Sequence, residues 1–252
     1  MPPAWTTDLP ANCSGARAAV ARGYNVLAFD GPVQSGPLHR EDLPFRPDWE
    51  KVVTPVVDYV LKQKGVDPSR IALLGTSMGG ELAPRAGAFE HRIAACIAND
   101  GLYDFAAAFL AMIPPAQHES FVAQVKAPPG PSPLDTILTG MAKASPVARW
   151  SFANGTWAFG VTGPREFLRK VFDYNLRDGV AEKIRCPTLV CDAEGDLFFK
   201  GQADELFNHL TCKKTLLRFA EAEGAGAHCQ VGAGRLAFAR IFDWLDQTLA
   251  QV

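Results

Sequence analysis

The sequence lacks the features that mark several common classes of protein. Its 25 basic and 27 acidic residues nearly cancel and leave a formal net charge of −2. Such a chain has no field that would collect a polyanion, so we expect no nucleic acid partner. No run approaches the roughly 18 apolar residues that span a bilayer, so no membrane partner is expected. The first residues have neither the basic start nor the apolar core of an export signal, which favours a cytoplasmic location.

The sequence also gives little sign of a cofactor. Its six cysteines are scattered, with no CxxC pair and no regular framework of spacings, which fits a reducing compartment. No group of His, Cys and Asp has the spacing of metal ligands, and neither a GxGxxG motif nor a phosphate-binding loop is present. We therefore expect neither a metal nor an organic cofactor.

What the sequence does contain is an alternation of apolar and amphipathic segments. We expect strands over residues 24–30, 70–75, 92–99, 186–192 and 214–219, and helices over residues 14–22, 48–62, 78–89, 200–210 and 231–249. Strands that alternate with helices at this spacing predict an α/β fold, in which helices cover both faces of a mostly parallel sheet.

Residues 103–180 interrupt this alternation. The segment carries proline clusters at 114–115 and 128–131, several aromatic residues and short helical pieces. We expect an inserted helical cap here, with residues 1–102 and 181–252 forming the α/β core.

The stretch Gly75-Thr-Ser-Met-Gly79 places a serine between glycines where a strand must reverse into a helix. Such a turn holds the hydroxyl above the sheet edge, and the helix behind it directs amide groups at a developing negative charge. An inert turn also needs small residues, so two interpretations are open. In the catalytic one, Ser77 is a nucleophile and the backbone N–H of Met78 donates to the oxyanion.

A serine nucleophile needs a general base and an acid that orients the base. His228 lies in a glycine-rich loop after the last expected strand, whereas none of the other four histidines follows a strand. Asp196 lies in the turn after the strand at residues 186–192, where the carboxyl ends of parallel strands face the site. Asp192 and Glu194 are the alternatives for the acid.

These residues, in the chain order Ser, Asp, His, resemble the α/β hydrolases. More narrowly, the chain is similar to the group that contains 2,6-dihydroxypseudooxynicotine hydrolase and the fungal polyketide-shortening hydrolases. The resemblance is carried by "RGYNVLAFDGP" (22–32), "FRPDWEKVVTPVVDYV" (45–60), "RIALLGTSMGGELAPRA" (70–86), "RIAACIANDGLYDF" (92–105), "DAEGDLFFKGQ" (192–202) and "EGAGAHCQ" (223–230). It implies a serine hydrolase with a helical cap, in which Ser77 is the nucleophile, Asp196 the acid and His228 the base. Some members of the group cleave carbon–carbon bonds next to a ketone, and others are esterases.

The resemblance also implies a longer N-terminal region, with a strand and a loop whose backbone supplies the second oxyanion donor. We expect the N-terminal strands to be missing from this sequence. Prolines 2 and 3 have no amide hydrogen, so the second donor is expected from residues 4–6, with Trp5 as the candidate.

Several other residues have two interpretations each. The candidates for substrate binding are Asn99, Asp100, Tyr103, Phe105 and Trp157. Loop hydrogen bonds and a small core within the cap would explain these residues as well. Glu81 is expected to be a solvated carboxylate in the first turn of its helix, with acid–base catalysis as the alternative. Cys229 is expected to be a buried thiol rather than a nucleophile.

The expected reaction is hydrolysis of a carboxylic ester through an acyl-enzyme, because an alkoxide leaving group needs only one proton. A carbon–carbon hydrolase acting next to a ketone is the first alternative, since its carbanion leaving group requires a substrate that delocalises charge. A binding module that keeps the triad without an oxyanion loop is the second. An aminopeptidase-like hydrolase would need an acidic pair that the sequence does not reveal. The expected partner is a small ester or ketone substrate, and the oligomeric state is open, with a homodimer as one candidate.

Overall fold

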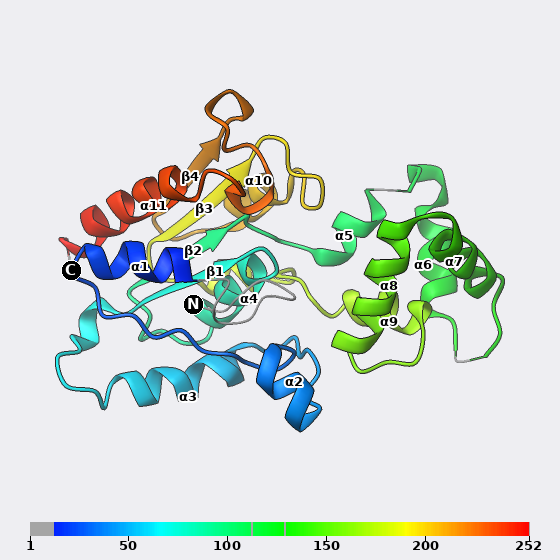
Figure 1. Cartoon of the computed structure of the whole chain (residues 1–252), viewed down its shortest axis with the longest axis horizontal. Coiled ribbons are helices and arrows are strands. Elements are labelled where there is room, and N and C mark those ends of the chain that lie inside the picture. The colour runs from blue at the N-terminus through cyan, green and yellow to red at the C-terminus, as the bar shows by residue number, and fades with distance from the viewer. Residues whose placement is uncertain (1–12, 112, 129, 252) are drawn as a thin grey trace.

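A parallel sheet of four strands organises the described part of the chain. The computed structural model describes residues 13–111, 113–128 and 130–251. Its sheet has the order β1-β2-β3-β4, with β1 at Ala72–Thr76, β2 at Ala95–Asn99, β3 at Thr188–Ala193 and β4 at Lys214–Phe219. All three strand pairs are parallel. The carboxyl ends of the strands therefore share one edge of the sheet, where the loops that follow them meet (Figure 1).

Helices cover both faces of this sheet. The helices α1 (Cys13–Ala21) and α11 (Gly234–Leu249) pack against each other on one face (Figure 1). The other face is covered by α3 (Glu50–Val60), α4 (Gly79–Gly87) and α10 (Gln202–His209). Neighbouring strand residues belong to different cores, with Leu73 in the core of α3 and α4 and Leu74 in that of α11. Successive side chains of a strand point to opposite faces of the sheet, so both faces are buried. This burial confirms the predicted α/β class.

A group of helices follows β2 and lies to one side of the sheet in Figure 1. These helices are α5 (Phe105–Leu110), α6 (His118–Lys126), α7 (Pro133–Ala144), α8 (Pro146–Ala158) and α9 (Pro164–Val171). Helix α7 begins with a capping box, because the Ser132 hydroxyl accepts a bond from the first turn while the Asp135 carboxylate accepts the Ser132 N–H. The role of this group as a cap stays a prediction. Among the described residues, no helix combines the length and hydropathy needed to cross a bilayer.

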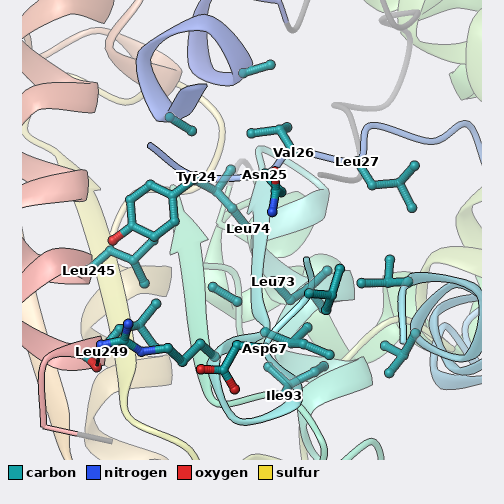
Figure 2. A pocket seen from close by; sticks show the side chains of 18 of the residues that line it. Tyr24, Asn25, Val26, Leu27, Asp67, Leu73, Leu74, Ile93, Leu245 and Leu249 are labelled. Carbon is teal, nitrogen blue, oxygen red and sulfur yellow. Dashed lines mark hydrogen bonds between the residues drawn. The ribbon is translucent and has the colours of Figure 1, made fainter. Parts of the chain in front are cut away.

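Residues 24–30 do not form the buried strand that their apolar composition predicts. The segment has no regular secondary structure, and Val26 and Leu27 are 37% and 39% exposed. Among the described strands, β1 pairs with β2 alone and none pairs with this segment. A groove of about 810 Å³ lies between β1 and this segment (Figure 2). The groove is lined by apolar side chains together with charged ones such as Arg22, Asp67 and Arg70, and Ser77, Asp196 and His228 are not among its lining residues.

The remaining predicted elements appear close to their expected bounds. A short helix, α2 (Ser35–Glu41), follows residues 24–30 and has no counterpart in the sequence prediction. Pro55 lies inside α3, the helix expected over residues 48–62. The expected strand at residues 186–192 is β3, and the turn that follows it leads through Asp196 to α10.

Candidate active site

The serine of the GTSMG stretch lies in a tight turn between β1 and α4. Ser77 has a φ of +58°, in the left-handed region that is strained for a side chain with a Cβ. Its N–H donates to the Asn99 carbonyl at 3.0 Å, and its carbonyl accepts the Gly80 N–H at 2.6 Å. A Cβ on Gly75 would lie 1.9 Å from the Gly79 carbonyl oxygen, and one on Gly80 would lie 2.1 Å from that of Asp100. Only glycines allow strand, turn and helix to pack this closely.

Three segments far apart in the sequence meet at this turn. The Ser77 hydroxyl oxygen lies 2.8 Å from His228 Nε2. His228 Nδ1 lies 2.8 Å from an Asp196 carboxylate oxygen. The structure thus brings together the three residues that the sequence singles out, each from a loop at the carboxyl edge of the sheet. In this arrangement Nδ1 keeps its proton and Nε2 accepts the one from Ser77.

Asp196 is held as an ionised acceptor. It is 7% exposed, and its second carboxylate oxygen accepts the N–H groups of Phe198 and Phe199 at 2.7 and 3.1 Å. Burial acts to raise the pKa of Asp196, but the hydrogen bond and charge of His228 and the two N–H donors outweigh it. The pKa therefore lies below its ordinary value of 3.8.

A second carboxylate also reaches the histidine. Asp100 Oδ2 lies 2.9 Å from His228 Nδ1, and the Asp100 side chain is only 1% exposed. Burial disfavours the imidazolium, but the hydrogen bonds to Asp100 and Asp196 favour it more. The pKa of His228 is therefore raised above its ordinary value of 6.5. The sequence prediction treats Asp100 as a substrate ligand, whereas the structure places it against the histidine.

The other acid and nucleophile candidates face elsewhere. Asp192 forms an ion pair with Arg218, and Glu194 accepts the backbone N–H of Glu221 at 2.8 Å. Neither carboxylate has a described contact with His228, so Asp196 is favoured over both. Cys229 is partly buried, and this burial raises the pKa of its thiol to about 11, which keeps it protonated at neutral pH.

One of the two candidate oxyanion donors lies within the described residues. Met78 follows Ser77, and no hydrogen bond in the described part of the chain uses its backbone N–H. This N–H precedes α4, whose N-terminus adds a favourable field for an anion. Trp5, the candidate for the second donor, lies outside the described residues.

The remaining substrate-binding candidates contact different parts of the molecule. Asn99 is 1% exposed, and its side-chain oxygen has no partner among the described residues. The Tyr103 ring stacks on His209 with centroids 4.3 Å apart, and the exposed Trp157 lies 4.9 Å from His39. Phe105 packs edge-on against Phe199, whose ring in turn lies 5.2 Å from His228. Of these four, Asn99 contacts Ser77 through its backbone carbonyl, and Phe105 is linked to His228 through the Phe199 ring.

The environment of Glu81 differs from the prediction of a solvated carboxylate. Glu81 is 1% exposed, and neither carboxylate oxygen has a hydrogen-bond partner among the described residues. Burial raises its pKa to about 8; Arg85 opposes this effect, while Glu50 and Asp104 add to it. With its pKa raised to about 8, the buried Glu81 is mainly a neutral acid at neutral pH.

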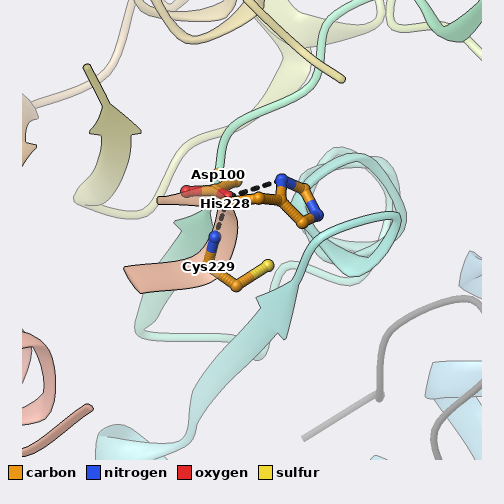
Figure 3. Close-up of side chains that lie close together, drawn as sticks. All are labelled: Asp100, His228 and Cys229. Carbon is orange, nitrogen blue, oxygen red and sulfur yellow. Dashed lines mark hydrogen bonds and ion pairs between the residues drawn. The ribbon is translucent and has the colours of Figure 1, made fainter. Parts of the chain in front are cut away.

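Asp100, His228 and Cys229 lie close enough to be considered as metal ligands (Figure 3). Their polar atoms already have other partners. His228 uses Nε2 for Ser77 and Nδ1 for the two carboxylates, and the Asp100 carboxylate accepts the Cys229 N–H. A zinc site would need a thiolate here, whereas burial keeps the Cys229 thiol protonated. We therefore assign these residues to the hydrogen-bonded site around the histidine.

The fold, together with these residues at one sheet edge, defines an α/β hydrolase. The sequence profile of the alpha/beta hydrolase family matches residues 2–240, and the chain belongs to this family. Among curated relatives, hydrolase LUC6 of a Fusarium species is 32% identical over 244 residues, which cover 93% of this chain and 57% of the relative. The 20-hydroxy-prefusarin hydrolase FUS2 of Gibberella moniliformis is 33% identical over 246 residues, which cover 94% of this chain and 58% of the relative.

Solved structures agree on the fold. The crystal structure of a 2,6-dihydroxy-pseudo-oxynicotine hydrolase superposes with a TM-score of 0.67 at 23% identity, and the match covers 96% of this chain and 57% of that chain. The chain thus spans a little over half the length of the relatives it matches. The resemblance found in the sequence motifs is confirmed.

Proposed function

We propose that the chain is a serine hydrolase that cleaves a carboxylic ester through an acyl-enzyme on Ser77. The observation that carries this proposal is the pair of 2.8 Å contacts, from the Ser77 hydroxyl to His228 Nε2 and from His228 Nδ1 to Asp196. Membership of the alpha/beta hydrolase family supports it.

In the proposed reaction, His228 Nε2 takes the hydroxyl proton as the Ser77 oxygen attacks the ester carbonyl. The Met78 N–H stabilises the oxyanion, and His228 then passes the proton to the leaving alkoxide. Water, deprotonated in turn by His228, releases the acid and restores the hydroxyl. Asp196 accepts the Nδ1–H throughout and stabilises each imidazolium.

The surroundings of the histidine favour an acyl group with apolar surface. The Phe198 ring lies edge-on to His228 with centroids 5.0 Å apart and is 52% exposed, and neighbouring Leu197 is 86% exposed. An apolar chain bound at Ser77 would cover part of this exposed surface, which is favourable.

A carbon–carbon hydrolase is the second candidate. It is favoured by the likeness to 2,6-dihydroxypseudooxynicotine hydrolase and its relatives, some of which cleave carbon–carbon bonds next to a ketone. The relative named 20-hydroxy-prefusarin hydrolase, which matches 94% of this chain, is compatible with it. The same Ser77 attack on a ketone would break the bond between the carbonyl carbon and the neighbouring carbon. The proton from His228 would then go to the carbanion, and water would supply the hydroxyl of the product acid.

The assay uses p-nitrophenyl butyrate and, separately, an aryl 1,3-diketone whose cleavage yields one acid and one ketone. We expect ester turnover that Ser77→Ala reduces by several orders of magnitude, as loss of a triad serine does elsewhere (roughly 10⁶-fold in kcat). The matched control is Ser120→Ala, at an exposed serine of α6. Diketone cleavage without ester turnover would favour the second candidate. Equal ester rates in wild type and Ser77→Ala, with no diketone cleavage, would exclude both hydrolase candidates. The interpretation as a binding module would then remain.

A further inference from the structure

Asp100 receives contacts from three consecutive residues of the histidine loop. Its Oδ2 lies 2.9 Å from His228 Nδ1 and also accepts the backbone N–H of Cys229 (Figure 3). Its Oδ1 accepts the Gln230 side-chain amide at 2.9 Å. Cys229 and Gln230 both have left-handed backbones, with φ of +55° and +52°. One carboxylate therefore holds the strained turn that presents the imidazole.

The position of Asp100 is itself fixed by the nucleophile turn. Asp100 follows β2 and has a φ of +56°. Its backbone packs against Gly80, where a Cβ would lie 2.1 Å from the Asp100 carbonyl oxygen. The N–H of the next residue, Gly101, donates to the Cys191 carbonyl of β3 at 3.0 Å. Asp100 thus joins the serine turn, the central strands and the histidine loop.

From this geometry we propose that Asp100 is a positioning residue for the proposed hydrolysis, a second carboxylate that shares the His228 Nδ1–H with Asp196. The titratable groups facing the imidazole are Asp100 after β2, Asp196 after β3, Cys229 beside it and the Ser77 hydroxyl. The two carboxylates stabilise the imidazolium more strongly than one does, which makes His228 a stronger base that is unprotonated only at higher pH.

Asp100→Asn tests the charge while keeping the shape. The Asn oxygen can replace Oδ2, and its amide nitrogen then faces Gln230. The Gln230 side-chain oxygen is buried and has no partner among the described residues, so a flipped Gln230 amide can accept the new donor. Asp192→Asn is the matched control, because it removes a carboxylate at the same end of the sheet that pairs with Arg218 instead.

The measurement is an NMR titration of the full chain labelled with ¹⁵N-histidine. The chain has five histidines, and His228→Gln identifies the resonance of interest. We expect Asp100→Asn to lower the His228 midpoint by about 1 to 3 pH units and Asp192→Asn to leave it in place. An unchanged His228 titration midpoint in folded Asp100→Asn would overturn the proposal. Asp100 would then only stabilise the conformation of the histidine loop.

Asp196→Asn gives a second test that leaves Asp100 intact. Because Asp100 remains, the His228 midpoint should stay above its ordinary value of 6.5 in this variant. A midpoint at or below that value would contradict the proposal, even if Asp100→Asn does not fold.

The proposal rests on the proposed function, but the titration needs no turnover. A chain without esterase activity can still show the Asp100 effect, and an active esterase can lack it, so the two failures are distinguishable. With ester turnover in hand, the acid limb of kcat/KM should move to lower pH in Asp100→Asn, and the fraction of the plateau rate reached at pH 7 should rise.

Discussion

Replacing Glu81 by glutamine is expected to change how stability depends on pH. In the folded chain the pKa of Glu81 is raised from 4.5 to about 8 by burial. Between these two values the folded state holds a proton that the unfolded state has lost. Stability therefore falls as pH rises through this window, by about 1.4 kcal/mol per pH unit. The loss reaches at most roughly 5 kcal/mol at pH 8 and grows no further above it.

Glu81→Gln removes this dependence, because glutamine does not titrate. Its amide donors are buried without partners, which costs roughly 1 to 3 kcal/mol at all pH values. We therefore expect the variant to be less stable than wild type at pH 5 and more stable at pH 8.5. Urea denaturation followed by circular dichroism at several pH values measures both curves. Glu119→Gln, at an exposed position in α6, is the control. Parallel curves for wild type and Glu81→Gln would refute the reasoning, since they would mean that Glu81 is not buried as a neutral acid.

Three further predictions concern the site. Gly80→Ala places a Cβ 2.1 Å from the Asp100 carbonyl oxygen and should lower the free energy of unfolding by about 1 to 3 kcal/mol. Gly36→Ala, with open space around it, should not lower it to this extent. Thermal denaturation compares the two variants, and equal melting temperatures would contradict the close packing at Gly80. Because the pKa of His228 is raised above 6.5, kcat/KM for p-nitrophenyl butyrate should fall as pH drops from the alkaline range and reach half its plateau above pH 6.5. A plateau that extends below pH 6 would be inconsistent with the two carboxylates. Asp196→Asn should lower kcat by less than the roughly 10⁴-fold seen where a single aspartate orients the histidine, because Asp100 still accepts the Nδ1–H; Glu194→Gln should keep near wild-type turnover in the same assay.

The sheet and its helices could be predicted because each element carries its own periodicity. Leu73 and Leu74 face different cores, and an apolar run of this kind indicates a strand buried on both faces. Ser77, Asp196 and His228 could be found for a related reason. Each follows a strand of one parallel sheet, so fold class alone brings their loops to one edge.

The exceptions depend on contacts that local sequence does not encode. The apolar residues 24–30 suggest a strand, but strand formation depends on pairing in the fold, and no described strand pairs with them. Glu81 has the sequence context of a solvated first-turn carboxylate and is buried by packing around α4. Asp100 reaches a histidine 128 positions away, and only the folded loop shows it. The Asn99-Asp100-Gly101 turn at the end of β2 is the one local signal that could have directed attention to it.

The central claim is that Ser77 is an activated nucleophile. The most direct measurement is labelling of the full chain with a fluorophosphonate, followed by peptide mass mapping of the modified residue. The account predicts a single adduct on Ser77 that disappears in His228→Gln, because the hydroxyl needs the imidazole to accept its proton. An unlabelled Ser77 in the folded chain, or a label on another residue that survives in Ser77→Ala, would contradict it.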